Sequence, residues 1–502
     1  MLGRLWRDRR GSYTVAFGIS GMTLVLAAGG TTDMMRYLDA RAKFQDAVDR
    51  TALIVATAHK NDESGSDDDT AKARDYLSKA FDSKFGTVSN VTATTGTNAL
   101  TVRGEAAVGT YFLKSGGINT LTATAQATTT WSASSLEIAL VLDNTGSMLD
   151  NGKLSALKSA ATSMVNTISA KASSTYTIKF SLVPFSNFVK VGSGYKTATW
   201  IDQGNSQKSS YYNSYFSSNL NRWTIYSNLG KTWPGCVESR PAPYDVDDTA
   251  PNTALPDTLF VPALYPDEPD GYSYSANSYV NDQSWGNEWT RLVNAQKYVS
   301  PSGQDFSNQT LYSNFPYAKG PGFMCSVQPL QRLTTDYASV KTQISNMVAV
   351  GSTNIPEGMA WGWRTLSPKG PFADGTSYAD TETSKIIVML TDGTNSINTF
   401  PNAAGGSYSS WGYPVSNRLG TNAGTNLRNG LDAKTREVCT KAKAAGIKVY
   451  TIGLMIDDSA GQQLLSDCSS GASYYYNSPS ASQLQSVFDD IAKKISKLRI
   501  SS

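Results

Sequence analysis

The sequence predicts an α/β protein built around a doubly wound parallel sheet. Short apolar runs of strand length occupy residues 136–143 and 385–390. Amphipathic helical patterns occupy residues 153–172 and 425–445. Buried strands that alternate along a chain with amphipathic helices are typical of parallel sheets covered on both faces.

The charge of the chain is concentrated at its N-terminus. The 502 residues contain 44 Lys and Arg and 41 Asp and Glu, and the first ten residues hold four Arg and one Asp. The remainder therefore carries 40 charges of each sign, which argues against a nucleic-acid binder with a broad basic surface. His59 is the only histidine, so chemistry that needs several imidazoles is excluded.

The first predicted element is a membrane span. Residues 11–32 contain no Asp, Glu, Lys or Arg, and as a helix they would reach roughly 33 Å, about the thickness of a hydrocarbon core. Because the arginines precede this stretch, we expect a cytoplasmic N-terminus and a body on the far side of the membrane. The alternative is a cleaved signal peptide. We favour a retained anchor because helix-compatible sequence continues through residues 34–58. Both readings imply export.

The chain is predicted to have three parts. Residues 1–60 form the basic N-terminus, the span and its helical continuation. Residues 61–135 form a small membrane-proximal α+β unit, with a polar stretch at 61–70, a helix at 71–85 and two or three strands over 98–131. Residues 136–498 form the doubly wound domain. Its other expected elements are strands at 176–189 and 448–454 and helices at 333–350 and 482–498.

A long irregular insertion is expected inside this domain, at about residues 192–331. Twelve of the 19 prolines and 12 of the 26 tyrosines fall between residues 201 and 330. The aromatic side chains could pack an irregular fold or face a protein partner, and we expect packing for most of them.

The cysteines predict two disulfides and an oxidising compartment. Four cysteines follow the predicted span, and their spacing does not suit zinc. Three pairings are open in principle. Proximity in sequence and domain placement favour Cys439–Cys468 and Cys236–Cys325.

Oxygen-bearing side chains gather where the predicted strands end. Asp143, Thr145 and Ser147 lie on the loop after the first buried strand, Thr353 precedes a predicted helix, and Asp392 follows another buried strand. Ligands of doubly wound sheets bind outside the carboxyl ends of the strands. Hydroxyls and carboxylates suit a hard divalent cation, so we expect Mg²⁺, with Mn²⁺ or Ca²⁺ as alternatives.

Glu357 has two readings. It is either an outer-shell group of this cation site or an acidic residue in the first turn of a helix, where the helix dipole favours it.

These residues resemble the metal-ion-dependent adhesion site of the von Willebrand factor type A domain, whose pattern is D-x-S/T-x-S followed by a Thr and an Asp. The resemblance implies that the hydroxyls of Thr145, Ser147 and Thr353 touch the metal and that Asp143 and Asp392 act directly or through water. It also implies an open position, commonly filled by a carboxylate of a protein partner. Thr145 stands where many members have Ser, and it keeps the hydroxyl.

Nearly all of the chain also resembles TadG-like proteins of the tight-adherence (Flp pilus) machinery, with about residues 61–135 as the least distinctive part. The segment YLDARAKFQDAVDRTAL is similar to the N-terminal region of TadE/TadG-like proteins, and GCVESRP, TLFVPALYPDEPDG, NSYVND and TNIPEGMAWGWRTLSP are similar to TadG-like segments. The resemblance implies a single-pass protein of the bacterial inner membrane with a periplasmic body and pilus-assembly partners. Gly11 is followed five residues later by Ala16 where prepilins have Glu, which argues against prepilin processing.

Three functions remain open on the sequence. The chain is a module that binds a protein through a cation, a scaffold in which the cation only stabilises the fold, or an enzyme. No Ser-His-Asp set can be assembled around the single histidine, so we predict that the chain is not an enzyme.

Overall fold

The fold comes from a computed structural model of the whole chain. Residues 1–9 of the basic N-terminus and residues 62–68 of the predicted polar stretch lie outside the residues that the structure describes. The described residues are 10–61, 69–95, 99–130, 135–173, 176–204, 221–270, 277–306, 308–312, 315–422, 424–478 and 480–501.

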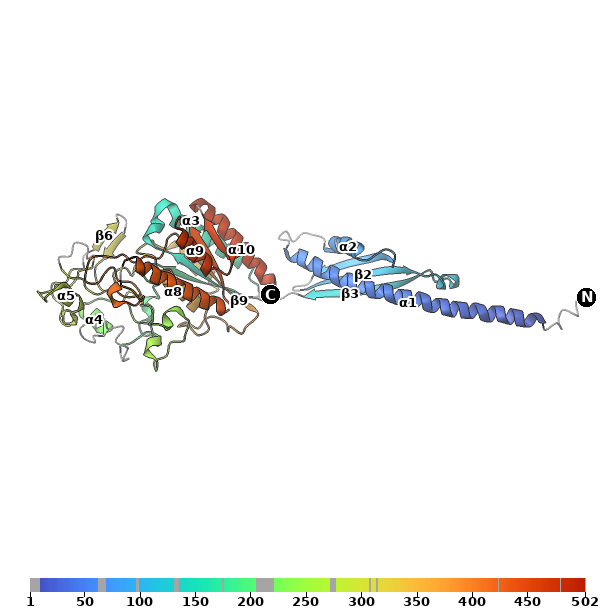
Figure 1. The fold of residues 1–502 in the computed structure, drawn as a ribbon, viewed down its shortest axis with the longest axis horizontal. Coiled ribbons are helices and arrows are strands. Elements are labelled where there is room, and N and C mark those ends of the chain that lie inside the picture. Colours follow the sequence, from blue (N-terminus) through green and yellow to red (C-terminus); the bar gives the residue numbers. More distant parts are fainter. Residues whose placement is uncertain are drawn as a thin grey trace, which may run out of the picture. The chain divides into compact units, whose positions relative to one another are not determined.

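The chain divides into two compact units, whose helices and strands are labelled in Figure 1. Unit 1 comprises Met1–Ala133 and Ile500–Ser502, and unit 2 comprises Ser134–Arg499.

Unit 1 packs two helices on an antiparallel sheet with the strand order β1-β2-β3. Its core is formed by apolar side chains from the second half of α1 together with α2 and the sheet, including Phe44, Leu77 and Leu100. The elements are α1 (Arg10–Asn61), α2 (Asp69–Ala80), β1 (Thr87–Thr95), β2 (Ala99–Gly109) and β3 (Thr120–Thr130).

The predicted membrane span over residues 11–32 is not supported. Among the described residues, no helix is both long and apolar enough to cross a membrane. Eleven of these 22 residues are Gly, Ser or Thr, and residues of this kind lower the hydropathy of a stretch that lacks charge.

Unit 2 confirms the prediction of a mixed α/β fold with a largely parallel sheet. Within the described residues, the sheet has six strands in the order β11-β10-β9-β4-β5-β8, and β8 alone runs antiparallel to its neighbour. Counted along unit 2, this order is 3-2-1-4-5-6 read from the β8 edge, the arrangement of a doubly wound sheet. The strands are β4 (Ser135–Asp143), β5 (Ile178–Phe185), β8 (Gln331–Thr334), β9 (Thr383–Thr391), β10 (Lys448–Leu454) and β11 (Tyr475–Ser478).

Two separate layers of apolar side chains cover the sheet, because successive strand residues point to opposite faces. Along β4, Ile138 and Leu140 join the core beneath α3, α6 and α10, whereas Ala139 and Val141 join the core beneath α7, α8 and α9. The helices are α3 (Lys153–Ser169), α6 (Tyr337–Ser345), α7 (Ile355–Leu366), α8 (Thr425–Ala444), α9 (Ser459–Cys468) and α10 (Leu484–Ser501).

Several elements differ from the sequence predictions. Strands β1 and β11 and helix α9 were not predicted. The helix predicted at 333–350 begins only at Tyr337, because the preceding residues extend as the antiparallel edge strand β8. Strand β11 has only four residues, and β1 is mostly exposed with Val91 as its one buried residue, so neither shows the alternation by which a strand is recognised.

The described part of the insertion packs against the rest of unit 2 through aromatic side chains. Phe260 of the insertion lies 4.8 Å, ring centre to ring centre, from Trp361 of α7, and Trp200 stands edge-on to Phe260. Both rings from the insertion are buried, which supports the packing role. Regular elements here are α4 (Arg222–Asn228), α5 (Glu288–Val293), β6 (Asn308–Tyr312) and β7 (Phe315–Ala318).

Both predicted disulfides are confirmed. Cys236–Cys325 closes the insertion with a Cα–Cα distance of 5.9 Å, and Cys439–Cys468 ties α8 to the end of α9 with a distance of 5.1 Å. All four cysteines are buried.

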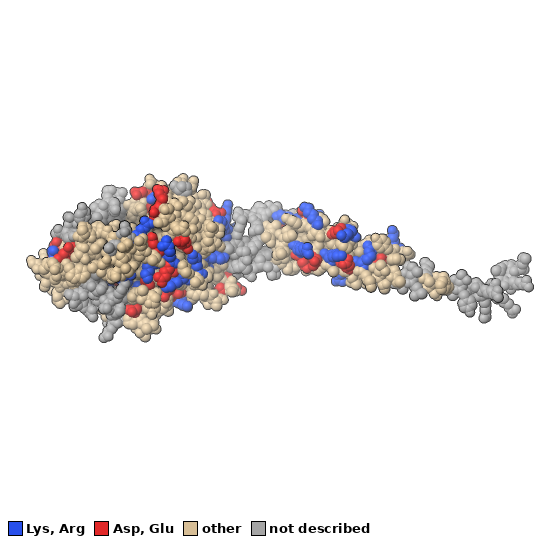
Figure 2. All heavy atoms as spheres, in the orientation of Figure 1, with Lys and Arg blue, Asp and Glu red and all other residues tan. Residues whose placement is uncertain are grey.

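Charged side chains of both signs are interspersed on the face of each unit that Figure 2 shows. Helix α8 carries exposed or half-exposed ion pairs, such as Lys441 with Glu437 within the helix and Arg436 with Asp467 of α9. Pairs of this kind contribute little to stability.

Candidate functional site

The candidate site lies at the carboxyl edge of the sheet, where β4 and β9 end side by side. The two strands are parallel and pair in register from Ser135 with Thr383 to Leu142 with Leu390. Asp143 is the last residue of β4, and Asp392 directly follows β9. The register therefore brings the two predicted carboxylates to the same edge.

Asp143 is fully buried and firmly oriented. Its Oδ1 accepts a hydrogen bond from the backbone N–H of Thr145 at 2.7 Å, and its Oδ2 accepts one from the Thr391 hydroxyl at 2.6 Å. Burial, and next the charge of Asp392, raise the pKa of Asp143 to about 7. Two carboxylates held together away from water are a favourable place for a cation.

Thr145 and Ser147 bring two hydroxyls to the same place. The oxygens Thr145 Oγ1 and Ser147 Oγ are 3.1 Å apart, and Ser147 Oγ donates to Asp392 Oδ1 at 2.7 Å. Thr145 is buried, whereas Ser147 is exposed on the short 3₁₀ segment η2 (Gly146–Gly152). The side of the site at Ser147 is thus open to solvent.

Thr353 joins the group from the loop that leads into α7. Backbone hydrogen bonds from Gly146 N to Gly351 O (2.9 Å) and from Val350 N to Asn144 O (2.6 Å) fasten this loop to the loop after β4. A Cβ built on Gly393 would lie 3.5 Å from Thr353 Oγ1 and 3.9 Å from Ser147 Oγ, so both hydroxyls border one point above Gly393.

A glycine is required at position 351 in this loop. Gly351 has a φ of +77°, and a Cβ there would lie 2.0 Å from Asn187 Oδ1. That Asn187 oxygen accepts a hydrogen bond from Ser352 N at 2.6 Å, which fixes the approach to Thr353. A side chain at position 351 would displace this loop.

The structure therefore brings all five predicted ligands to one edge: Asp143, Thr145, Ser147, Thr353 and Asp392. Their donors are two carboxylates and three hydroxyls, which suits Mg²⁺, Mn²⁺ or Ca²⁺. Among the described residues there is no group of three or more His, Cys, Asp and Glu side chains placed to hold a metal ion. The five predicted ligands include two carboxylates and three hydroxyls, so they are not a group of that kind. That they bind a metal ion stays a prediction.

Sequence analysis missed Lys153, the first residue of α3. Its Nζ donates to Asp392 Oδ2 at 2.8 Å, and the lysine is buried. A lysine in the first turn of an amphipathic helix ordinarily faces solvent, so nothing in the local pattern marks it. Thr391, which orients Asp143, was also missed.

Glu357 does not turn towards the candidate ligands. It is buried and accepts hydrogen bonds from Ser239, from Ser410 (3.2 Å) and from Trp361 Nε1 (2.8 Å). Ser239 belongs to the insertion, so Glu357 ties helix α7 to that segment.

His59 lies in unit 1, where its Nδ1 is 2.8 Å from Asp69 Oδ2. Its side chain is about one-third exposed.

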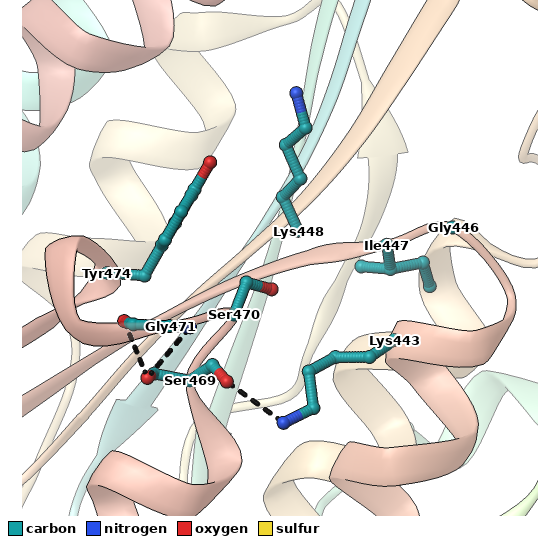
Figure 3. A pocket seen from close by; sticks show the side chains of 8 residues that line it. All are labelled: Lys443, Gly446, Ile447, Lys448, Ser469, Ser470, Gly471 and Tyr474. Carbon is teal, nitrogen blue, oxygen red and sulfur yellow. Dashed lines mark hydrogen bonds between the residues drawn. The ribbon is translucent and has the colours of Figure 1, made fainter.

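A cavity of about 560 Å³ lies at the opposite, amino edge of the sheet (Figure 3). Lys448, at the start of β10, lines it together with Lys443, Ser469 and Tyr474. Lys443 Nζ donates to the backbone oxygens of Asp467 (2.7 Å) and Ser469 (2.9 Å), so the protein itself engages this ammonium group. The candidate site is at the other end of the strands.

No protein-family model matches the chain, and no curated protein matches it either. Among solved structures, the chain is similar to the pilus adhesin SpaC from Lactobacillus rhamnosus GG, with 11% identity and a TM-score of 0.33 over 82% of this chain and 33% of that one. It is also similar to the vWF domain of the type V pili tip protein Mfa5 from Porphyromonas gingivalis, with 10% identity and a TM-score of 0.34 over 74% of this chain and 97% of that one.

A third similar structure is the pilus adhesin RrgA from Streptococcus pneumoniae, with 10% identity and a TM-score of 0.31 over 80% of this chain and 48% of that one. The chain thus spans about a third of the length of SpaC and about half that of RrgA. TM-scores this low do not assign the chain to a family.

Proposed function

We propose that this protein is a binding module that captures a protein partner through a divalent cation. The hydroxyls of Thr145, Ser147 and Thr353 and the carboxylates of Asp143 and Asp392 would hold the cation, with Mg²⁺ as the expected ion. The bound cation supplies a Lewis-acidic position that accepts an acidic side chain of the partner.

The observation that carries this proposal is the contrast in exposure within the site. Asp143, Thr145, Thr353 and Asp392 are buried, whereas Ser147 is exposed. A cation held by this set would meet solvent on the Ser147 side. An open position of this kind is where a carboxylate from another protein can enter.

The charge of the site supports an acidic partner. Two carboxylates neutralise a 2+ ion by at most two formal charges, and hydroxyl ligands add none. Glu357 accepts hydrogen bonds from Ser239, Ser410 and Trp361 and does not face the site. As a third carboxylate ligand it would have weakened the attraction of the cation for a partner carboxylate. The cation is therefore left able to attract a further carboxylate.

We place this activity in the tight-adherence (Flp pilus) assembly machinery, on the periplasmic side of the bacterial inner membrane. The resemblance of several segments to TadG-like proteins supports the assignment to this machinery. The disulfides Cys236–Cys325 and Cys439–Cys468 support an oxidising compartment. Pilus-assembly components are the expected partners.

The test is partner capture from native membranes by the full chain, with Mg²⁺ or with EDTA. Asp143→Ala combined with Thr353→Ala should abolish a capture that wild type shows only with Mg²⁺. Asp150→Ala is the matched control, because Asp150 is exposed on η2 beside the site and is not among the five ligands. Capture that survives the double substitution would contradict the proposal.

A second candidate function is a scaffold in which the cation only stabilises the fold. It is favoured by the burial of Asp143, since a cation would relieve the repulsion between this carboxylate and Asp392. The same double variant separates the two functions. A scaffold predicts a lower melting temperature with capture intact, whereas a binding module predicts lost capture in a protein that still folds.

A further inference from the structure

Lys153 places a buried ammonium group on one of the two site carboxylates. Its Nζ lies 2.8 Å from Asp392 Oδ2, and its side chain is only 10% exposed, against 0% for the aspartate. A pair this sheltered is weakly screened by water and salt, so its charge acts on the whole site.

The two oxygens of Asp392 have different partners. Oδ2 accepts from Lys153, whereas Oδ1 accepts from the Ser147 hydroxyl. Asp392 can therefore offer Oδ1 towards the hydroxyl side of the site while its other oxygen stays bonded to the ammonium group. Lys153 thus contributes charge to the site without occupying its open side.

The formal charges show what this lysine changes. With Asp143 and Asp392 ionised and Lys153 protonated, the net formal charge of the empty site is −1. It becomes +1 when a divalent cation binds, and zero when a partner carboxylate joins the cation. With a neutral residue at position 153, the same three states are −2, zero and −1. The lysine opposes the cation and favours the carboxylate.

We infer that Lys153 weakens the binding of the cation and strengthens the binding of an acidic ligand to the site that holds the cation. This inference rests on the proposed function. It means that Lys153 favours a carboxylate over a neutral group as the ligand that binds the cation. A lysine that only stabilises the fold would not act on the two affinities in opposite directions.

The experiment uses the full chain, Mn²⁺ followed by electron paramagnetic resonance, and a blocked aspartate (N-acetyl-aspartyl amide) as the carboxylate probe. Lys153→Met should bind Mn²⁺ about tenfold more tightly or better than wild type, because a nearby like charge is removed. At one fixed concentration, blocked aspartate should tighten Mn²⁺ binding by wild type relative to blocked asparagine, and this enhancement should be smaller in Lys153→Met.

Three further variants act as controls. Lys153→Arg keeps the charge and should retain the wild-type enhancement by aspartate. Lys153→Gln is a second neutral variant and should behave as Lys153→Met does, even if methionine disturbs folding. Lys158→Met removes a lysine from the same helix α3, one that bonds to the backbone of Ser345 at 2.9 Å, and should leave both affinities unchanged.

The outcomes separate this inference from the proposed function. If wild type binds Mn²⁺ and the folded neutral variants bind it equally or more weakly, the inference fails while the cation site stands. If blocked aspartate enhances Mn²⁺ binding equally in wild type and in the neutral variants, the inference also fails. If neither wild type nor the neutral variants bind Mn²⁺, the proposed function itself is contradicted.

Discussion

Two buried clusters of charge in unit 2 have opposite character. At the sheet edge, the ammonium group of Lys153 pairs with Asp392, whereas Asp143 accepts hydrogen bonds from the uncharged Thr145 N–H and Thr391 hydroxyl. The exposed Ser147 leaves this cluster open to solvent. Neutralisation there is incomplete, which is the condition that favours a cation.

The second cluster joins the insertion to the loop that follows β9. Here one carboxylate, Glu238, accepts hydrogen bonds from Arg222 (2.6 Å), Arg418 (3.0 Å) and Tyr408, and all four residues are buried. This carboxylate is matched by more positive charge than it carries and is shut off from water. The contrast shows what distinguishes a ligand site from a structural cluster. Buried carboxylates indicate a ligand site where positive side chains do not balance their charge and solvent reaches them. They indicate a structural role where positive side chains outnumber them and water is excluded.

The largest effect is expected from breaking the closed cluster. Glu238→Ala leaves two buried guanidinium groups without their carboxylate, so the free energy of unfolding should fall by about 3–5 kcal/mol. Urea denaturation measures this loss. Glu437→Ala, which breaks half-exposed pairs with Lys434 and Lys441 on α8, should cost less than about 1 kcal/mol. Equal losses in the two variants would remove the distinction between the clusters.

The open cluster should instead respond to a cation. Mg²⁺ at about 100 times its Kd should raise the free energy of unfolding of the wild type by about 2.7 kcal/mol, because the ion binds only the folded site. Thermal denaturation with and without EDTA measures this shift. Asp143→Ala should abolish the response, and Asp150→Ala should keep it. A full response in Asp143→Ala would mean that the ion binds elsewhere.

A smaller effect is expected from pH, at a carboxylate of the insertion. Burial raises the pKa of Glu268 to about 7, and its folded-state pKa is then above that of the unfolded chain, near 4.5. The folded protein thus holds this proton more tightly, so the stabilisation is complete below pH 4.5 and is lost as the pH rises through 7.

Asp143, whose pKa is also raised to about 7, titrates in the same window when EDTA keeps the site free of cations. Wild type should therefore lose about 2 kcal/mol of stability between pH 6.5 and 8 in EDTA, measured by urea denaturation, and Glu268→Gln should roughly halve this loss. The window starts at pH 6.5 because burial raises the pKa of the neighbouring Asp267 only to about 6. Glu382→Gln, at an exposed position, is the control. An unchanged slope in Glu268→Gln would show that this carboxyl is not the titrating group.

The sheet and its carboxyl edge were predictable because their signals are local. A fully buried strand such as β4 reads as a continuous apolar run, and the residue that ends it, here Asp143, must appear at the sheet edge. The hydroxyl pattern after Asp143 lies within four residues of it. These features needed no knowledge of distant contacts.

The remainder depends on contacts between residues far apart in sequence. Ser239 meets Glu357 across 118 positions, and Lys153 meets Asp392 across 239, with no periodicity that pairs them. The insertion is held by aromatic rings whose partners, such as Trp361, lie on another element. The predicted membrane span is not supported for a different reason. A stretch without charges is not strongly apolar when half of its residues are Gly, Ser and Thr.

The central claim is that the hydroxyls and carboxylates at the ends of β4 and β9 hold one cation together with Thr353. A Mn²⁺ titration of wild type and Thr353→Val, followed by electron paramagnetic resonance, tests it most directly, because this substitution removes the hydroxyl and keeps the shape of the side chain. We predict one Mn²⁺ site per chain in wild type and at least about tenfold weaker binding in Thr353→Val. Equal binding by both proteins would contradict the claim.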